Sequence, residues 1–294
     1  MGPVFWIVPA LAAPLLWGAS NLVDSHLVNR AERDPFTLAI IAGIFASLPA
    51  LFVIATGRWI WCGWETATVA LVGGALGIIV YLPYLAALRI ASPSVVILMW
   101  NLSPVAIVAI AHFTVKERLA GSEYVAVGLL VAGSAIASLC SDHGRSVARA
   151  VPLMILASLI LAVSSVAEKA TYDRLTFWAG FGWLSAGAAA ATLFLLLASP
   201  RARRELRSAA RDKMLGVYVG NESLDLAAIY SVNLATSLAP VSLVHAVGGT
   251  QPVFILLIEQ FLPRRAGSTR VEWLRTALAA ALAVVGLGLL RSPT

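Results

Sequence analysis

The sequence predicts an all-α polytopic membrane protein whose helices cross the bilayer ten times. Hydrophobic residues make up 60% of the 294 residues, charged residues make up only 12%, and the mean hydropathy is +0.86. A soluble domain of this length carries about twice that charged fraction. Ten apolar stretches fill almost the whole chain, and each is close to the ~20 residues that a helix needs to cross a hydrocarbon core of ~30 Å. They leave no room for a soluble domain.

The first five expected spans precede the most polar mid-chain connection, and they cover residues 4–23, 35–56, 66–88, 93–114 and 121–140. The first lacks a basic segment before it and a small-residue cleavage site after it, so we interpret it as a retained span and not as a signal peptide. Three tryptophans after the second span, Trp59, Trp61 and Trp64, are typical of an interfacial belt.

The last five expected spans cover residues 151–170, 177–198, 214–236, 240–262 and 272–290. Small residues are dense in the third, fifth, seventh and tenth spans, for example Gly73 and Gly74. Such residues let helix backbones approach each other closely in a membrane. We therefore interpret them as packing positions.

The charged residues and cysteines exclude several classes of function. The formal net charge is +6, but the Lys and Arg residues lie at span ends and in short connections, which argues against nucleic-acid binding. Cys62 and Cys140 lack metal-ligand spacing and are expected to be free thiols. No Walker-type phosphate loop is present in the sequence. We expect no cofactor and no metal.

The distribution of positive charge bears on orientation. With ten spans, the odd-numbered connections carry fifteen of the 21 Lys and Arg residues, and six of those fifteen lie in the single stretch from Arg201 to Lys213. The positive-inside rule then favours both termini outside the cytoplasm. A missed or extra span would change this count.

Two segments resemble each other at a spacing of about 148 residues. Each has one proline that opens a span and a second proline eleven or twelve residues later, first Pro93 and Pro104, then Pro240 and Pro252. With five spans in each half, such a duplication must be inverted in the membrane. Inverted repeats are the recurrent architecture of secondary transporters, with the substrate site at the interface of the repeats.

Several short motifs make the chain similar to the drug/metabolite transporter superfamily, of the EamA type. These are Trp17-Gly18-Ala19-Ser20-Asn21, Tyr84–Leu88, the Ala91–Val105 block, Lys116-Glu117-Arg118-Leu119 and the Ala239–Leu256 block. The resemblance implies two inverted five-helix repeats, residues 1–143 and 144–294, around a cavity lined by spans one, three, four, six, eight and nine. It also implies cytoplasmic termini, in conflict with the charge count, so orientation stays open. Pro263-Arg264-Arg265 stands where the glutamate signature would recur.

The eighth span carries two carboxylates, Glu222 and Asp225, which lie ~12 and ~17 Å from its start and share a helix face with Tyr218. Ionisable residues inside a span are costly and usually face a cavity or the bundle interior. Two carboxylates this close should not both ionise cheaply, so one is expected to hold a proton. That arrangement suits proton coupling or a cationic substrate. The alternative is a structural hydrogen-bonded network.

Two further polar sites lie one turn before a helix-loosening residue. His245 precedes Gly248 and Gly249, and it could relay protons with the carboxylates or simply be packed. Trp100 and Asn101 precede Pro104 at the equivalent place in the fourth span and are expected to contact substrate.

Aromatic and polar residues of spans one and three complete the candidate site. Tyr81 and Tyr84 flank a proline in the third span, and Trp17 lies in the first, where Asn21 and Asp24 continue its face. These rings can hold a cation, or they can be ordinary bundle packing. Two other acidic residues are expected to have structural roles: Glu168 paired with Lys169, and Glu117 paired with a nearby arginine.

These observations favour a secondary-active transporter of a small organic metabolite, such as an amino acid or an amine, working by alternating access. Its energy would come from a proton gradient, from exchange or from the substrate's own gradient. The alternative is a flippase for an amphipathic or lipid-linked substrate. We expect no enzyme, because neither H-E-x-x-H nor G-x-S-x-G occurs. Expected partners are the lipid bilayer and the substrate. We expect a monomer or a homodimer, located in a bacterial inner membrane.

Overall fold

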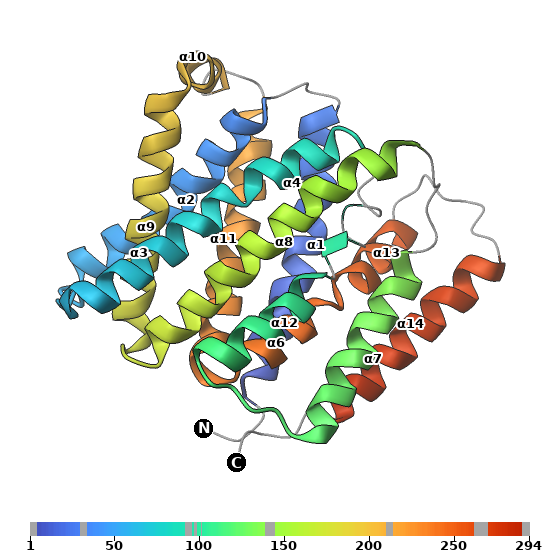
Figure 1. Ribbon diagram of the computed structural model, residues 1–294. Helices are drawn as coiled ribbons and strands as arrows, with labels where there is room; N and C mark the ends of the chain where they lie inside the picture. Colours follow the sequence, from blue (N-terminus) through green and yellow to red (C-terminus); the bar gives the residue numbers. More distant parts are fainter. Residues whose placement is uncertain are drawn as a thin grey trace.

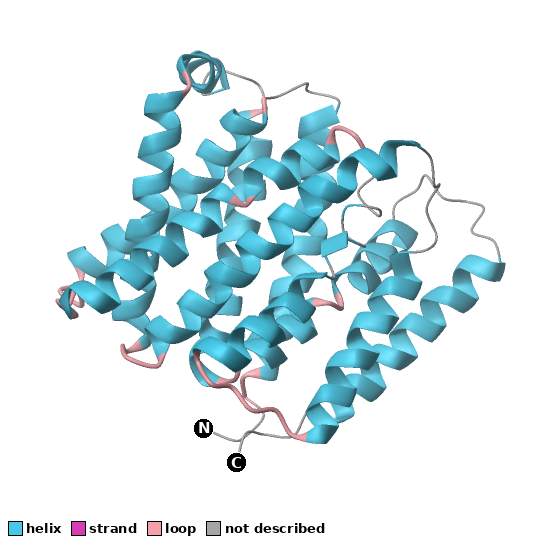
Figure 2. Ribbon diagram, viewed as in Figure 1, coloured by secondary structure: helices cyan, strands magenta, loops and turns pink. Residues whose placement is uncertain are grey.

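The protein is helical throughout its described part. The computed structural model describes residues 5–29, 34–91, 96, 99–100, 102–138, 145–209, 214–261 and 270–289. Within these ranges the chain forms helices joined by short turns and contains no strand (Figure 2). Asn101, Cys140 and residues 141–144 of the expected connection between the repeats lie outside the described residues.

Thirteen helices are described, and Figure 1 labels them along the chain. They are α1 (Ile7–Asn29), α2 (Pro35–Ala55), α3 (Gly63–Ile79), α4 (Tyr81–Leu88), α6 (Leu102–Thr114), α7 (Gly121–Ser138), α8 (Arg145–Tyr172), α9 (Phe177–Ala198), α10 (Pro200–Ala209), α11 (Leu215–Leu238), α12 (Val241–Gly248), α13 (Gln251–Phe261) and α14 (Arg270–Leu289).

Five segments are long and apolar enough to cross a membrane: Ile7–Val28, Pro35–Ala55, Gly63–Leu88, Ala148–Tyr172 and Phe177–Ala198. They confirm the expected first, second, third, sixth and seventh spans, although the first extends five residues further than expected. Shorter apolar helices occupy the expected fourth, fifth, ninth and tenth spans, at Leu102–Thr114, Gly121–Gly133, Val241–Ile255 and Ala280–Leu289.

The expected eighth span differs from the others. Its helix, α11, has 24 residues, yet it is not among the five strongly apolar segments. The reason is its polar content, because it contains Asn221, Glu222, Asp225 and Asn233, each at most 5% exposed. The polar side chains of α11 therefore face the interior of the protein.

Prolines break two of the expected spans. A proline has no N–H for the carbonyl four residues earlier. Pro83 cannot donate a backbone hydrogen bond to the carbonyl of Ile79. Helix α3 ends at Ile79, and α4 begins two residues later. In the same way, Pro252 cannot donate a backbone hydrogen bond to the carbonyl of Gly248. Helix α12 ends at Gly248, and α13 begins at Gln251. Both breaks free backbone groups in the middle of the molecule.

Glycines set the closest helix contacts. A Cβ on Gly74 of α3 would lie 1.8 Å from the carbonyl oxygen of Leu184 on α9, and a Cβ on Gly187 of α9 would lie 2.2 Å from that of Leu71 on α3. Only glycine permits this approach. The other extensive contacts join α2 to α9, α1 to α11, α3 to α8 and α7 to α14.

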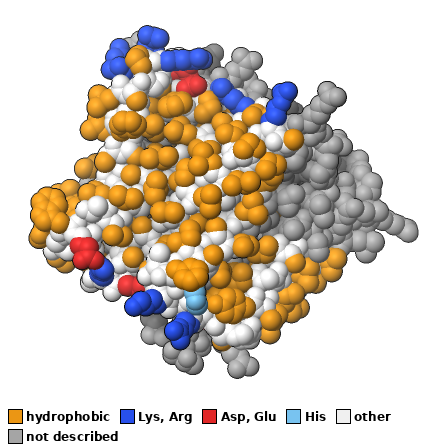
Figure 3. Space-filling model, in the orientation of Figure 1, with side chains coloured by type: hydrophobic (Ala, Val, Ile, Leu, Met, Phe, Trp, Pro, Cys, Tyr) orange, Lys and Arg blue, Asp and Glu red, His pale blue; other side chains and the backbone are white. Residues whose placement is uncertain are grey.

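The surface agrees with a membrane location. Figure 3 shows apolar side chains across most of the described surface on one face, with Lys and Arg gathered toward its two ends. Large apolar side chains such as Phe113, Trp64 and Phe194 are 82%, 79% and 66% exposed. Water would oppose such exposure on this scale, whereas lipid accommodates it. The basic end in the upper part of the view is α10, a short polar helix that the sequence did not predict.

Candidate functional site

A cavity of about 170 Å³ lies among the helices in the middle of the molecule. Its lining comes from α1, α2, α3, α4, α6, α8, α9, α11, α12 and α13, together with Trp100. The α7–α14 pair contributes no side chain to it among the described residues. The cavity therefore involves the expected spans one, three, four, six, eight and nine, and also spans two and seven.

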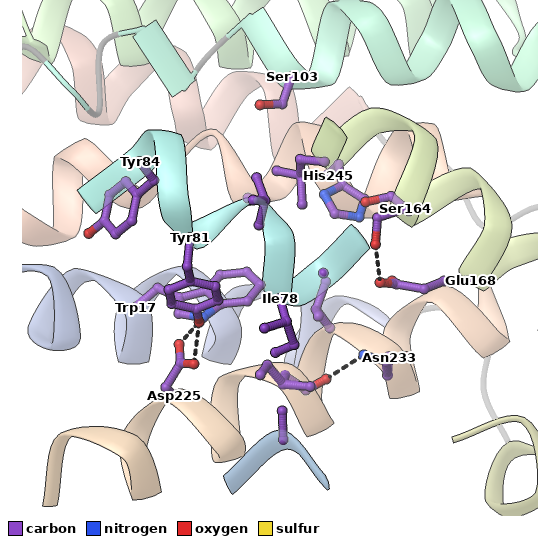
Figure 4. A pocket seen from close by; sticks show the side chains of 18 of the residues that line it. Trp17, Ile78, Tyr81, Tyr84, Ser103, Ser164, Glu168, Asp225, Asn233 and His245 are labelled. Carbon is purple, nitrogen blue, oxygen red and sulfur yellow. Dashed lines mark hydrogen bonds between the residues drawn. The ribbon is translucent and has the colours of Figure 1, made fainter. Parts of the chain in front are cut away.

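One side of the cavity is built around Asp225 of α11. The indole Nε1 of Trp17 donates a hydrogen bond of 2.7 Å to Asp225 Oδ1, and the hydroxyl of Tyr81 donates to Oδ2. Figure 4 shows both rings meeting at this carboxylate. Helices α1, α4 and α11 are thus joined by a single buried side chain.

A second carboxylate, Asp24, lies on the same side. Asn221 Nδ2 donates to Asp24 Oδ1 at 2.8 Å, and the Tyr84 hydroxyl lies 3.3 Å from Asp24 Oδ2. The Tyr84 hydroxyl also contacts the amide oxygen of Asn21, whose Nδ2 donates to the Trp17 carbonyl at 2.8 Å. We call this side the α1 wall; it consists of Trp17, Asn21, Asp24, Tyr81, Tyr84 and Asp225.

The break between α3 and α4 positions the two tyrosines of the α1 wall. Because α4 restarts at Tyr81, Tyr81 and Tyr84 are three residues apart at the beginning of a new helix and lie on one face. Their rings are in edge contact, with centroids 6.2 Å apart, and Tyr84 meets the ring of Trp100 at 5.3 Å. Pro83 therefore aims two hydroxyl groups at carboxylates of other helices.

The opposite side of the cavity carries Glu168 of α8. Its Oε1 lies 3.3 Å from Ser164 Oγ, but that hydroxyl also lies 2.8 Å from the Gly73 carbonyl. A hydroxyl has one proton to donate, and the shorter distance favours donation to the Gly73 carbonyl. The expected pairing of Glu168 with Lys169 is wrong, since Lys169 forms its ion pair with Asp173 at 2.9 Å.

Two buried polar atoms beside Glu168 have no hydrogen-bond partner within the described structure. They are Ser165 Oγ on α8 and His245 Nε2 on α12. Both side chains line the cavity, with exposures of 0% and 8%. Figure 4 places His245 beside Ser164, on the side away from Asp225. We call this side the α8 wall; it consists of Ser164, Ser165, Glu168 and His245.

The sequence-predicted site residues fall into three groups. Seven line the cavity: Trp17, Asn21, Tyr81, Tyr84, Trp100, Asp225 and His245. Tyr218 and Glu222 are buried, at 2% and 5% exposure, but are not part of the lining. Asn101 lies outside the described residues. Of the two carboxylates on the eighth span, only Asp225 therefore reaches the cavity.

Sequence reasoning left several lining residues out of the candidate site, chiefly Asp24, Glu168, Asn233, Ser164 and Ser165. A signal existed for two of them. Asp24 lies two turns after Trp17, and Glu168 lies one turn after Ser164, so each continues a polar helix face. Asn233 accepts a hydrogen bond of 2.7 Å from Tyr172, a partner 61 residues away that spacing alone could not reveal.

The charge of the lining is one-sided. Three carboxylates reach the cavity, from Asp24, Glu168 and Asp225, and no described Lys or Arg is among the lining residues. Five aromatic rings accompany them, from Trp17, Tyr81, Tyr84, Trp100 and Phe181. Carboxylates and ring faces both attract cations, and a buried carboxylate without a counter-charge is costly.

Glu117 holds a helix end far along the chain. Its carboxylate accepts hydrogen bonds from the backbone N–H groups of Val241 and Ser242, at 2.7 and 3.2 Å, and from Ser242 Oγ at 2.5 Å. It therefore caps the N-terminus of α12, and no described arginine forms the expected ion pair with it. Lys116, directly before it, has φ of 57°, in the left-handed region that non-glycine residues rarely adopt.

Glu205 makes a similar contact in the polar connection outside the spans. Its Oε2 accepts from Thr37 Oγ1 at 3.1 Å and from the Asp34 N–H at 3.4 Å, and its Oε1 accepts from Arg201 at 2.9 Å. Partial burial acts to raise the pKa of Glu205, but the hydrogen bonds from Arg201, Thr37 and Asp34 outweigh it, so the pKa is lowered. Glu205 thus anchors α10 to the start of α2.

Comparisons with known proteins agree with this architecture. The model of the EamA-like transporter family matches residues 4–139. No curated protein matches the chain in sequence. A solved structure described only as the crystal structure of a protein matches with a TM-score of 0.71, over 98% of this chain and 97% of its own, at 20% identity. At that identity the likeness shows a shared fold and nothing about function.

Proposed function

We propose that this chain, whose residues 4–139 match the model of the EamA-like transporter family, is a secondary-active transporter that moves a small organic metabolite across a membrane by alternating access. The observation that carries this proposal is the central cavity. It is lined by two proline-broken helix pairs, which is the arrangement in which transporters expose backbone groups to a substrate near the middle of the bilayer.

The helix contacts support two inverted five-helix repeats, residues 1–143 and 144–294. If α1 to α7 and α8 to α14 are equivalent, exchanging the halves turns the α1–α11 contact into the α8–α3 contact, and both are extensive. The α2–α9 and α7–α14 contacts map onto themselves. In Figure 1, α1 and α8 run in opposite directions, which is what inversion requires.

The lining favours a substrate with an amine or another cationic group. The three carboxylates and the aromatic rings supply counter-charge and ring faces, whereas no described Lys or Arg is placed to meet a substrate carboxylate. Because the sequence has no Walker-type loop, we propose that a proton gradient, exchange or the substrate's own gradient drives transport.

The test is uptake of labelled amines and amino acids by the purified protein in proteoliposomes, with and without an imposed pH gradient. We expect Glu222→Gln and Asp225→Asn to remain folded and inserted, and at least one to abolish transport or to change its dependence on the gradient. Glu65→Gln is the matched control, since Glu65 is 79% exposed in an ion pair with Arg174. If both variants transport as wild type does, the carboxylates are structural.

A further inference from the structure

The two helices that open the halves carry the same polar pattern. In α1 it reads Ser20-Asn21-Leu22-Val23-Asp24, and in α8 it reads Ser164-Ser165-Val166-Ala167-Glu168. In both, the carboxylate lies four residues before the end of an apolar segment, Ile7–Val28 or Ala148–Tyr172. The serine, the next polar residue and the acid of each copy all line the cavity. Glu168 is therefore the counterpart of Asp24 in the second half of the chain.

The two copies also have equivalent neighbours. Asp24 of α1 contacts Asn221 of α11, and Ser164 of α8 contacts the carbonyl of Gly73 on α3. Asn221 and Gly73 are 148 residues apart, close to the spacing of the proline motifs in the two halves. Because α1 and α8 run in opposite directions (Figure 1), the C-terminal ends of these helices, near which Asp24 and Glu168 lie, point toward opposite ends of the molecule.

The equivalent carboxylates differ in how well the protein satisfies them. Asp24 accepts a hydrogen bond of 2.8 Å from the amide of Asn221, and the Tyr84 hydroxyl lies 3.3 Å from its carboxylate. Among the described residues, Glu168 has only the Ser164 hydroxyl at 3.3 Å, and the proton of that hydroxyl is better placed for the Gly73 carbonyl. A half-buried carboxylate with so little support is costly unless a ligand or a proton completes it.

Two other groups of the α8 wall also need a partner. Ser165 Oγ and His245 Nε2 are buried, line the cavity and have no partner within the described structure. A buried polar atom without a hydrogen bond costs free energy, so each of these is a place where a ligand atom would be stabilised. Nε2 of a neutral imidazole accepts a hydrogen bond when the proton is on Nδ1.

We infer that Glu168, Ser165 and His245 form a subsite that binds the ammonium group of a transported primary amine, with Asp24 as its counterpart toward the opposite end of the molecule. An ammonium group has three N–H donors, and the wall offers one carboxylate and two unpaired acceptors. The aromatic rings of the α1 wall face it across the cavity and suit an aromatic body on the same amine (Figure 4). This inference rests on the proposed transport function and names its substrate class.

The first experiment is calorimetric titration of the detergent-solubilised protein with tyramine, tryptamine and putrescine, and with tyrosol and tryptophol, in which a hydroxyl replaces the ammonium group. We expect wild type to bind at least one aromatic amine about tenfold or more tightly than its alcohol, because a hydrogen bond to a charged group is stronger than one between neutral groups.

Two variants test the residues themselves. Glu168→Gln should weaken amine binding about tenfold or more and leave alcohol binding unchanged, because only the charge is removed. Ser165→Ala should weaken amine binding about threefold to tenfold without loss of thermal stability, because the hydroxyl it removes has no partner. Glu65→Gln, on an exposed side chain outside the cavity, should bind as wild type does.

The outcomes separate the subsite from the transport function. If wild type binds none of the three amines, or if Glu168→Gln and Ser165→Ala bind them as tightly as wild type does, the subsite is overturned. Uptake by proteoliposomes is measured in parallel on wild type with the amines and with neutral and acidic solutes. Uptake of any of these solutes keeps the transport function even when the subsite fails, whereas uptake of none of them contradicts both.

Discussion

The two walls of the cavity carry similar polar residues, but they differ in how many of these residues have hydrogen-bond partners within the described structure. On the α1 wall, Asp225 accepts hydrogen bonds from Trp17 and Tyr81, and Asp24 accepts one from Asn221. On the α8 wall, the part of the chain that the structure describes gives Glu168 one poorly placed donor and leaves Ser165 Oγ and His245 Nε2 without a partner. Buried polar groups that pair within the protein hold helices together, whereas those left unpaired are places for a ligand. The first wall therefore joins helices to one another, and the second is where we propose that the ammonium group of a ligand binds.

The largest effect on stability should follow removal of the central acceptor of the α1 wall. Asp225→Ala leaves the Trp17 N–H and the Tyr81 hydroxyl without their buried partner, so the free energy of unfolding should fall by about 2–5 kcal/mol. Asp225→Asn should lose much less, because its amide oxygen accepts from Trp17 and its amide group donates to the Tyr81 oxygen. Thermal unfolding in detergent measures both. Equal stability of Asp225→Ala and wild type would show that the α1 wall does not join the helices.

A smaller loss is expected where a helix of the α8 wall begins. Glu117 caps α12, which carries His245. Glu117→Ala should destabilise the protein by about 1–2 kcal/mol, since it removes both a cap and a negative charge at a helix N-terminus. Glu117→Gln should recover part of this, because its amide oxygen still accepts one N–H. A melting temperature unaffected by Glu117→Ala would exclude the cap as a support of the α8 wall.

The contact of Glu205 with α2 provides a reference outside both walls. Its lowered folded-state pKa means that the charged form stabilises the fold at neutral pH, and that this stabilisation disappears as the pH falls through the folded-state value. Below about pH 4, near the ordinary range for glutamate, the melting temperature of wild type should therefore fall more steeply than that of Glu205→Gln. Parallel curves would contradict this assignment. Neither protein should differ in amine binding at neutral pH.

The smallest effect on stability should come from the α8 wall itself. Ser165→Ala removes a buried hydroxyl that has no partner, so the melting temperature should stay the same or rise slightly. This change in melting temperature is to be compared with that of Asp225→Ala, because both residues line one cavity. A clear loss of stability in Ser165→Ala would mean that its hydroxyl already has a structural partner.

The spans and most of the aromatic lining could be predicted because lipid imposes a simple requirement on sequence. A segment must be apolar and about 20 residues long, and this identified Pro35–Ala55 and Phe177–Ala198 almost to the residue. Proline and glycine spacing also pointed to the breaks at Pro83 and Pro252, since both residues act on the backbone locally. These properties depend only on neighbours in the chain.

The partners of the polar residues could not be predicted in the same way. Glu168 was expected to pair with its sequence neighbour Lys169, and Glu117 with a nearby arginine, yet their partners are set by helix packing. Glu117 reaches residues 124 and 125 positions away. Glu222 was singled out for its depth in the eighth span, and it lies one turn before Asp225, yet only Asp225 lines the cavity. The depth of a residue in a span follows from the sequence, whereas the direction in which its side chain faces depends on how the helices pack.

Filling the cavity tests directly whether substrate passes through it. Gly77 lines it, and a Cβ there would meet only Ser164 Oγ, at 3.5 Å. Gly77→Leu should therefore fold with a melting temperature close to that of wild type while its side chain occupies the cavity. Gly128→Leu is the matched control, on an exposed face of α7 with nothing within 4 Å of the new Cβ. We expect uptake by Gly77→Leu proteoliposomes to fall to background while Gly128→Leu transports as wild type does. Wild-type uptake by correctly folded Gly77→Leu would show that substrate does not pass through this cavity.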